Sequence, residues 1–202
     1  IKPFKMLYQQ HEIILASGSP RRKAFMEQLN IPFTVKTIPV DEVFPLSLKG
    51  KFIAEHIVKK KNAPFTKIVK PSQIIITADT IVWCDQRYLG KPNNIVEARE
   101  MLEFLSGRVH EVITAVGFLT AYTFEVLTET TQVYFKKLKE SEIDYYLQLA
   151  PPLDKAGAYG IQDWIGTVGI VKIEGSYTNV VGLPLPRVKE KIEDLIAAAE
   201  RN

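Results

Sequence analysis

The chain has little cysteine and no long apolar run. Cys84 is the only cysteine among 202 residues, which excludes an internal disulfide framework and favours a reducing cytoplasmic setting. No apolar stretch reaches the length of a membrane-spanning helix, and the first residues do not have the form of a secretory signal. The three histidines are scattered with no cysteine pattern nearby, which argues against a zinc site.

No linker, repeat or low-complexity tract divides the sequence, so residues 1–202 are predicted to form one α/β domain. Hydrophobic periodicity predicts strands at residues 13–16, 32–38, 74–78, 109–118, 126–135 and 168–173, and leaves open that residues 81–83 continue the third of them. Helices are predicted at residues 20–29, 48–62, 94–105 and 141–149, and after Pro186. Phe52 and Ile95 are expected among the buried residues of their helices.

The charge is divided unevenly along the chain. Residues 1–70 carry 13 Lys and Arg against 5 Asp and Glu, a net charge of +8. The remaining residues carry 13 against 18, a net charge of −5. A basic first third suits an anionic ligand, nucleic acid included, although a run such as residues 59–61 is also typical of a solvated helix face.

The stretch at residues 13–29 organises the rest of the chain. A short apolar strand breaks at a small-residue turn, and a helix follows with Ser19 as its N-cap and Pro20 at its first position. The next three residues, Arg21, Arg22 and Lys23, crowd cations at the positive end of the helix dipole. An anion docked there would relieve the repulsion, so the pattern predicts either a phosphate site or a solvated cationic helix end.

A second feature is the carboxylate of Asp79, which follows the apolar run at residues 74–78. Open α/β sheets keep their chemistry at the carboxyl ends of their strands. A carboxylate there can bind a metal ion or activate a water molecule, whereas Asp79 and Thr80 could also merely cap the next element.

Further charged and polar residues could converge on the same ligand. They are Lys61, Lys91, Asp154, Lys155 and Gln162. Each has a plain structural alternative when it is taken alone. A lysine in a turn is usually a surface residue, adjacent Asp and Lys usually form an ion pair, and a loop glutamine often binds backbone.

At this point the sequence resembles the Maf-like family. Motifs in the family's order run along nearly the whole chain: ILASGSPRR (14–22), ADTIV (78–82), LGKP (89–92), LSGRVHEVITAV (105–116), LDKAGAYGIQ (153–162) and GSYTNVVGLPL (175–185). Several motifs in one order are far more specific than any single motif.

The resemblance implies a fold and an activity. The implied fold is a single α/β domain of the Maf and ITPase type, with an elongated, mixed and twisted sheet flanked by helices and two lobes around a central cleft. The implied activity is that of a nucleoside triphosphate pyrophosphatase, which uses a divalent cation, Mg²⁺ or Mn²⁺, to split the α–β bond. Its partner is a small-molecule nucleotide; no membrane or specific nucleic acid is expected, and a homodimer is left open.

Residue roles follow from the same resemblance. The SPRR, ADT and GIQ forms resemble the branch that acts on dTTP and UTP. Asp79 matches the proton acceptor, and Glu42 with Asp79 is expected to help place the metal ion. Substrate binding and specificity are expected to involve Ser19, Arg21, Arg22, Lys61, Thr80, Lys91 and Gln162.

The chain departs from the family pattern at three places. Asn62 follows Lys61 where alanine is usual, residues 86–87 stand where a glycine is common, and residues 163–164 replace small residues after GIQ. The alternatives are a pyrophosphatase for other modified or non-standard nucleotides, such as 7-methyl-GTP, and a nucleic-acid-binding regulatory protein.

Overall fold

The computed structural model describes Tyr8 and residues 10–201. The strands are β1 (Glu12–Leu15), β2 (Phe33–Val35), β3 (Gln73–Cys84), β4 (Arg87–Leu89), β5 (Val109–Leu119), β6 (Phe124–Phe135) and β7 (Ile170–Glu174). The helices are α1 (Pro20–Gln28), α2 (Lys51–Asn62), α3 (Ile95–Leu105), α4 (Glu140–Leu149), α5 (Trp164–Gly169), α6 (Tyr177–Val181) and α7 (Leu185–Ala199), with 3₁₀ turns η2 (Ala63–Phe65) and η3 (Ala156–Ala158). Within these described residues, no helix combines the length and the apolar character needed to cross a bilayer.

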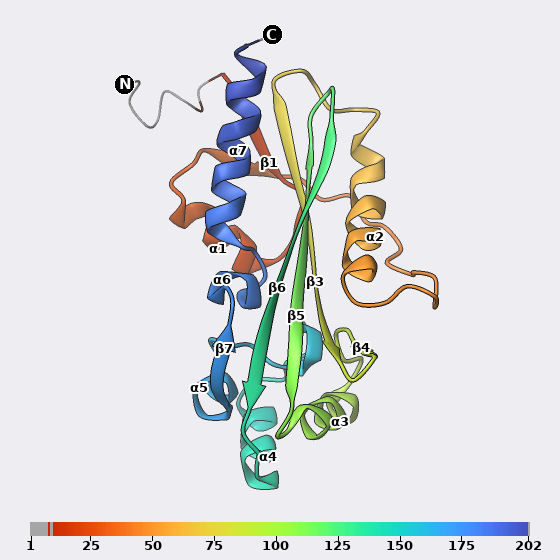
Figure 1. Cartoon of the computed structure of the whole chain (residues 1–202), viewed down its shortest axis with the longest axis vertical. Coiled ribbons are helices and arrows are strands. Elements are labelled where there is room, and N and C mark those ends of the chain that lie inside the picture. The colour runs from red at the N-terminus through yellow and green to blue at the C-terminus, as the bar shows by residue number, and fades with distance from the viewer. Residues whose placement is uncertain (1–7, 9, 202) are drawn as a thin grey trace.

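All seven strands form one mixed sheet. Its order is β2-β1-β3-β5-β6-β7, and β4 pairs with β3 off this path. β1 is parallel to β2 and β3, whereas the other pairings are antiparallel. The long strands β3, β5 and β6 run most of the length of the molecule (Figure 1), so the predicted elongated, twisted, mixed sheet is confirmed.

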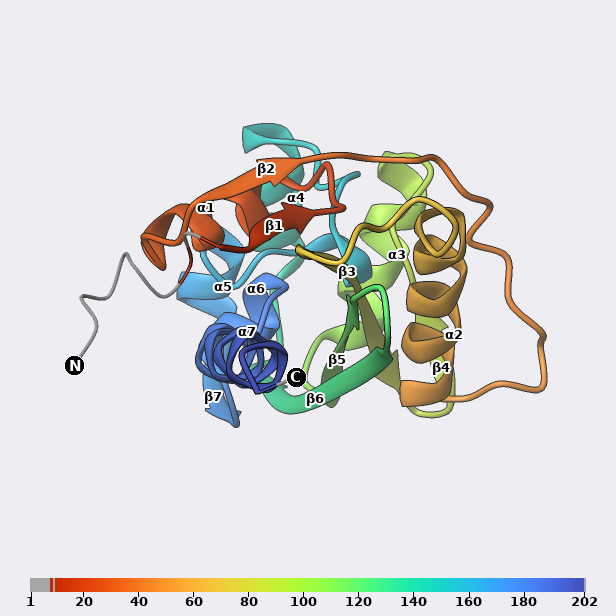
Figure 2. The ribbon, with the colours of Figure 1, turned by 90° about the horizontal axis from the view of Figure 1, so that it is seen from above.

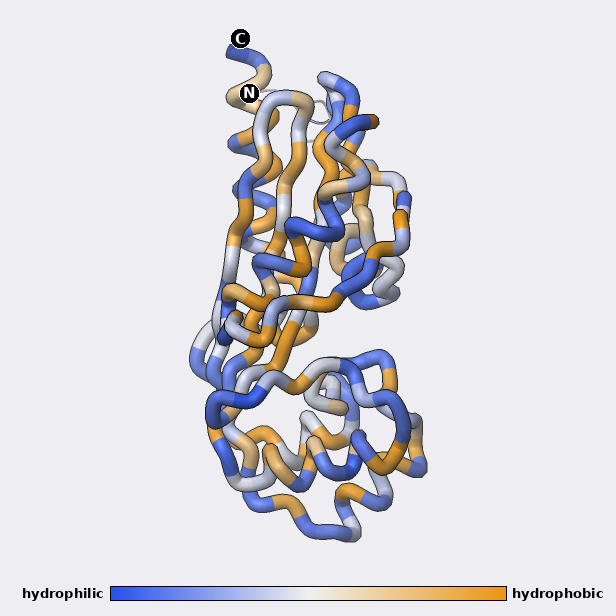
Figure 3. Tube along the Cα trace, turned by 90° about the vertical axis from the view of Figure 1, so that its right-hand side faces the viewer, coloured by the Kyte–Doolittle hydropathy of each residue, from blue (hydrophilic) through white to orange (hydrophobic). Residues whose placement is uncertain are grey.

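Helices pack on both faces of this sheet and divide the core into an upper and a lower part. Seen from above, α7 and α2 lie on opposite sides of the upper sheet (Figure 2). The upper cores lie beneath α1 with α7 and beneath α2, and the lower core gathers α3, α4 and α5 around the other end of the strands. Figure 3 shows the upper and lower parts of the molecule, called here the upper and lower bodies, with the long strands joining them.

One edge of β3 is interrupted at the middle of the strand. β5 pairs with one edge of β3 along residues 75–83. β1 and β4 both pair with the other edge, which is the interrupted one. β1 covers it up to Ile76, and β4 covers it again from Val82. In the part of the chain that the structure describes, residues 77–81 have no strand beside them there, because the chain turns after β1 into α1. The gap brings β3 next to the N-terminus of α1.

Successive side chains of a strand point to opposite faces, and this alternation sorts the residues in the gap. Ala78 belongs to the core beneath α1 and α7, and Ile81 belongs to the core beneath α2. Asp79 is therefore directed toward α2, and Thr80 toward α1.

The prediction that this strand ends before Asp79 is wrong. β3 is one strand from Gln73 to Cys84, because its antiparallel pairing with β5 continues past Asp79 and Thr80. What ends at Ile76 is the pairing with the parallel neighbour β1.

Two residues expected to be buried on their helices are exposed. Phe52 is 55 % exposed, because the buried stripe of α2 begins one residue later at Ile53 and a step of one residue turns about 100° around a helix. Ile95 is 38 % exposed at the first position of α3, before the buried stripe that starts at Ala98.

Several predicted boundaries also shift. β2 is confined to Phe33–Val35, and α2 begins after Gly50, whose φ of +50° sets the start of the helix. α4 begins at Glu140, because Glu142 accepts a hydrogen bond from the backbone of Lys139 and so fixes the cap there. The strand predicted at residues 168–173 is the end of α5 followed by β7.

Candidate active site

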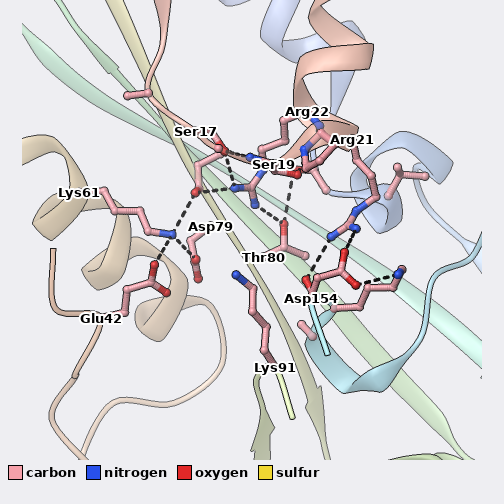
Figure 4. Close-up of a pocket in the computed structure, with 18 of the residues that line it drawn as sticks. Ser17, Ser19, Arg21, Arg22, Glu42, Lys61, Asp79, Thr80, Lys91 and Asp154 are labelled. Atoms are coloured by element: carbon pink, nitrogen blue, oxygen red, sulfur yellow. Dashed lines mark hydrogen bonds and ion pairs between the residues drawn. The ribbon is translucent and has the colours of Figure 1, made fainter. Parts of the chain in front are cut away.

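A cavity of about 520 Å³ opens at the gap in the edge of β3. Its walls come from the turn before α1, the loop before α2, the middle of β3, the segment at Lys91 and the loop at residues 154–162. It brings together every residue that the sequence analysis assigned to the site: Ser19, Arg21, Arg22, Glu42, Lys61, Asp79, Thr80, Lys91 and Gln162. Figure 4 shows most of these side chains converging from both bodies of the molecule.

The start of α1 forms as predicted. Ser19 caps the helix by accepting a hydrogen bond from the backbone N–H of Arg22, and Pro20 occupies its first position. The three cations that follow each have a partner within the protein. Arg21 pairs with Asp154, Arg22 binds backbone carbonyls, and Lys23 lies 3.8 Å from Glu27 one turn along the helix.

Arg22 turns back into the protein and fills the gap beside β3. Its Nη1 donates to the carbonyl of Ala78 at 2.9 Å, and its Nε donates to the carbonyl of Gly182 at 2.9 Å. Its Nη2 donates to the Thr80 hydroxyl at 3.0 Å, and Nη1 also reaches Ser17 Oγ at 3.3 Å. The planar guanidinium thus replaces the missing strand as a hydrogen-bond partner of β3.

The Thr80 hydroxyl is held inside the same network. It lies 2.9 Å from Thr114 Oγ1, and Thr114 donates its own proton to the carbonyl of Asn179 at 3.1 Å. With Thr114 donating to Asn179, the single proton of Thr80 goes either to Thr114 or to the carbonyl of Gly182 at 3.4 Å, while the Thr80 oxygen accepts from Arg22. What remains for a ligand is one lone pair, so Thr80 can accept a hydrogen bond from a bound base but cannot donate one.

On the other face of β3, Lys61 joins two carboxylates. Its Nζ lies 2.7 Å from Asp79 Oδ1 and 3.1 Å from Glu42 Oε1, and it reaches the carbonyl of Ala78 at 3.4 Å. Asp79 is only 7 % exposed, whereas the Glu42 side chain is half exposed on its loop. Two acidic groups are thus fixed around one ammonium at the cavity wall.

The ionisation of Asp79 reflects its burial. Removal from water raises the pKa of its carboxyl above the ordinary value, while Lys61 and Arg22 oppose that shift. A carboxylate with a raised pKa is a stronger base than an ordinary surface carboxylate.

Arg21 spans the cavity to the opposite wall. Its Nη1 donates to Asp154 Oδ2 at 2.5 Å, and Lys155 Nζ donates to the other oxygen of that carboxylate at 2.8 Å. Partial burial opposes ionisation of Asp154, but these two bonds hold its pKa at about 2. The ion pair expected for Asp154 and Lys155 is present, and it also serves as one wall of the cavity.

The loop that carries Asp154 is fixed against β3 and Lys91. The N–H of Gly157 donates to the carbonyl of Gly90 at 3.0 Å. A side chain at Gly157 would meet Val82 at 2.9 Å, and its φ of +68° also favours glycine. This contact sets the loop beside Lys91.

Lys91 and Gln162 are the site residues most available to a ligand. Both are exposed, and no hydrogen bond or ion pair joins either side chain to another described residue. Lys91 points into the space between Asp79 and Asp154 (Figure 4), and Gln162 lies on the wall formed by the Asp154 loop.

Sequence reasoning gave no role to two further residues of this site. Ser17 is buried, and its hydroxyl oxygen accepts from Ser19 N and from Arg22. The carbonyl of Gly182 binds Arg22 from a segment about 160 residues further along the chain. A site role for Ser17 could have been suspected from its place in the ASGSP motif. The role of the Gly182 carbonyl could not, because every residue has a backbone carbonyl and no residue type signals its use.

The residues present fit a hard divalent cation. Glu42 and Asp79 supply carboxylate oxygens, and Mg²⁺ commonly binds one or two carboxylates together with the phosphates of its substrate. Among the described residues no set of three His, Cys, Asp or Glu side chains could hold a metal ion by itself. The donor set therefore suits a cation that arrives with a phosphate ligand.

Comparison with known proteins agrees with this geometry. The model of the Maf-like protein family matches residues 12–195. A dTTP/UTP pyrophosphatase of Christiangramia forsetii is 48 % identical over 94 % of this chain and 97 % of its own length. A dTTP/UTP pyrophosphatase of Phocaeicola vulgatus is 45 % identical over 93 % of this chain and 97 % of its own.

A solved structure supports the fold. The Staphylococcus aureus Ham1 protein superposes with a TM-score of 0.51 at 14 % identity, covering 91 % of this chain and 98 % of that one. The predicted family and fold are thereby confirmed. The match along the family model and the identity to full-length relatives show that this chain is a member of the Maf-like protein family.

Proposed function

We propose that this chain is a nucleoside triphosphate pyrophosphatase that hydrolyses dTTP and UTP to the nucleoside monophosphate and pyrophosphate. One observation carries the proposal: a single cavity joins a buried carboxylate paired with a lysine, Asp79 and Lys61, to the cations Arg21 and Lys91 on its other walls. Relatives of 45–48 % identity that bear the name dTTP/UTP pyrophosphatase support the choice of substrate.

The cations of the cavity suit a triphosphate. Arg21 and Lys91 would bind the β- and γ-phosphates, and Lys155 adds a further positive charge beside them. Arg22 would contribute positive charge but few hydrogen bonds to the ligand, because its N–H groups are largely bound to β3 and Gly182. Phosphoryl transfer depends mostly on positioning and on charge stabilisation, which such a cavity supplies.

Asp79 would act on the attacking water. Its carboxylate accepts the proton of a water molecule that attacks the α-phosphorus, and pyrophosphate departs toward the cations. Lys61 holds that carboxylate in one orientation through the 2.7 Å bond. Glu42 and Asp79 would hold a Mg²⁺ or Mn²⁺ ion, which when bound withdraws charge from the phosphates.

Base selection would fall to two polar groups of the cavity, Thr80 on β3 and Gln162 on the Asp154 loop. The free amide of Gln162 offers both a donor and an acceptor, whereas the bound Thr80 hydroxyl offers an acceptor alone. A pyrimidine edge with an N–H matches this pair. A base whose edge does not match would cover the Gln162 amide without satisfying its hydrogen bonds, which disfavours that base. We also propose a cytoplasmic location and expect no specific nucleic-acid partner, and a homodimer is left open.

A nucleotide screen tests the proposal. Purified protein would be incubated with each common nucleoside triphosphate, and with 7-methyl-GTP, in the presence of Mg²⁺ or Mn²⁺. We expect dTTP and UTP to be turned over better than ATP or GTP, with monophosphate and pyrophosphate as the products. A diphosphate with orthophosphate, or equal rates on all nucleotides, would contradict it.

The pH dependence of turnover should report Asp79. A proton acceptor works only in its ionised form, so the rate should fall as pH falls through its pKa. Because burial raises that pKa, the fall should begin at a higher pH than the ordinary carboxyl value of 3.8 would give. The measurement is kcat/KM from pH 3 to 9 at low metal concentration, because that ratio reports the groups of the free enzyme, in which no bound cation lowers the pKa of Asp79. An acid limb at the ordinary value would show that Asp79 is not the group that titrates.

A further inference from the structure

The three lysines at the end of α2 have different surroundings, although the sequence presents them as one run. Lys61 meets Asp79 and Glu42 in the cavity. Lys60 points to the preceding loop, where its Nζ donates to the carbonyl of Val43 at 2.9 Å. Lys59 is exposed, and no hydrogen bond or ion pair joins its ammonium to another described residue.

Lys60 holds the loop on both sides of Glu42. The carbonyl of Val43 accepts its hydrogen bond, and the carboxylate of Asp41 lies 3.8 Å from the same ammonium. Asp41 also accepts a hydrogen bond from the backbone N–H of Val43 at 3.0 Å, which closes a tight turn around Glu42. Two adjacent lysines of α2 thus bind the turn. Lys60 binds its backbone at Val43, and Lys61 binds the side chain of Glu42.

The residue that follows this turn is anchored beside the core beneath α2. Phe44 packs edge-on against Tyr88 of β4, with ring centroids 4.9 Å apart. Half exposure of the Glu42 side chain means that burial alone does not fix it. Its place in the cavity therefore depends on its own ion pair with Lys61 and on the anchors of its neighbours, of which Lys60 is the charged one.

We propose that Lys60 is a positioning residue, which acts on the reaction by holding the turn at residues 41–43 so that Glu42 faces Lys61 and Asp79. The inference rests on the proposed function, in which Glu42 helps to hold the cation. Lys60 itself touches no reacting atom in this account.

Lys60→Met and Lys59→Met form a matched pair, since each removes one ammonium from the same helix and keeps an unbranched stem. We expect Lys60→Met to lower kcat about three- to tenfold, as befits a partly exposed charge-assisted hydrogen bond. Lys59→Met should match wild type, and Lys60→Arg should keep most of the activity because it keeps a donor. Equal kinetics of the two methionine variants would overturn the proposal.

A double-mutant cycle shows whether the effect passes through Glu42. Lys60→Met should have little further effect on kcat when Glu42→Gln is already present, because the group that it positions is gone. Full additivity of the two losses would also overturn the proposal. Binding of Mn²⁺ with a non-hydrolysable nucleotide, followed by electron paramagnetic resonance, should weaken in Lys60→Met and not in Lys59→Met.

Hydrogen exchange separates this inference from the proposed function. The amide of Val43 should exchange faster in Lys60→Met than in Lys59→Met, while the global Tm of the two variants stays alike. A wild-type chain that released no pyrophosphate would contradict the proposed function, and exchange would then decide the structural part. Equal exchange in the two variants would refute Lys60 as the anchor of the turn.

Discussion

Replacing Asp79 by asparagine should abolish most of the turnover while leaving the fold in place. Asparagine is nearly isosteric with aspartate, so packing on β3 is kept while the charge and the basic oxygen are lost. Loss of a general base costs about 10²–10⁴ in rate, which is roughly 3–5.5 kcal/mol of barrier. A second role in holding the metal ion would bring the loss to the upper end of that range or beyond.

Nucleotide binding should survive this change better than turnover does. Arg21 and Lys91 remain in Asp79→Asn. The substitution removes one negative charge from the cavity, so it adds no repulsion against a triphosphate. Turnover and nucleotide affinity would be measured on one purified variant, with circular dichroism to verify folding. A folded Asp79→Asn protein that kept more than about a tenth of wild-type turnover would remove Asp79 from the mechanism, since even a modest general base contributes more.

The two adjacent arginines of α1 should respond very differently to replacement by lysine. Arg22→Lys keeps the charge but loses the fork that binds Ala78, Thr80 and Gly182 at once. A lysine ammonium can still reach one of these three partners, which leaves two without their hydrogen bond. An unsatisfied buried polar group costs about 1–3 kcal/mol, so the loss of two should lower Tm by roughly 5–15 °C in a domain of this size. Turnover should fall about 10–100-fold, because β3 no longer holds its reacting residues in register.

Arg21→Lys is the matched control for stability. Its side chain is 27 % exposed and its partner Asp154 is 56 % exposed, and such pairs contribute about 0–1 kcal/mol. The Tm of Arg21→Lys should therefore stay near that of wild type. The KM for nucleotide should rise, because an ammonium cannot bind a phosphate through two parallel hydrogen bonds as the Arg21 guanidinium can. Thermal melts and steady-state kinetics of both variants decide the matter. Equal melting temperatures would mean that Arg22 does not support β3.

The sequence predicted the local part of this site well. Ser19 as an N-cap and Pro20 at the first helical position are properties of neighbouring residues, and both are confirmed. The order of motifs along the chain predicted the family, and with it the fold. The roles of Asp79, Glu42 and Gln162 in catalysis and binding remain predictions.

What the sequence could not predict depends on contacts between distant segments. Arg21 and Arg22 are neighbours, yet about 100° of helix rotation sends one to Asp154 and the other into the edge of β3. The continuity of β3 past Asp79 was left open by the sequence, because two polar residues usually mark the end of a buried run. Here the pairing with β5 continues through both of them. The lysines at residues 59–61 were likewise indistinguishable until the loop at Glu42 was placed beside them.

Hydrolysis in ¹⁸O-labelled water tests the central claim most directly. In this account a water molecule activated at Asp79 attacks the α-phosphorus of dTTP or UTP, so mass spectrometry should find the heavy oxygen in the nucleoside monophosphate and none in pyrophosphate. Label recovered in pyrophosphate or orthophosphate would place the attack on another phosphorus atom and would contradict the account.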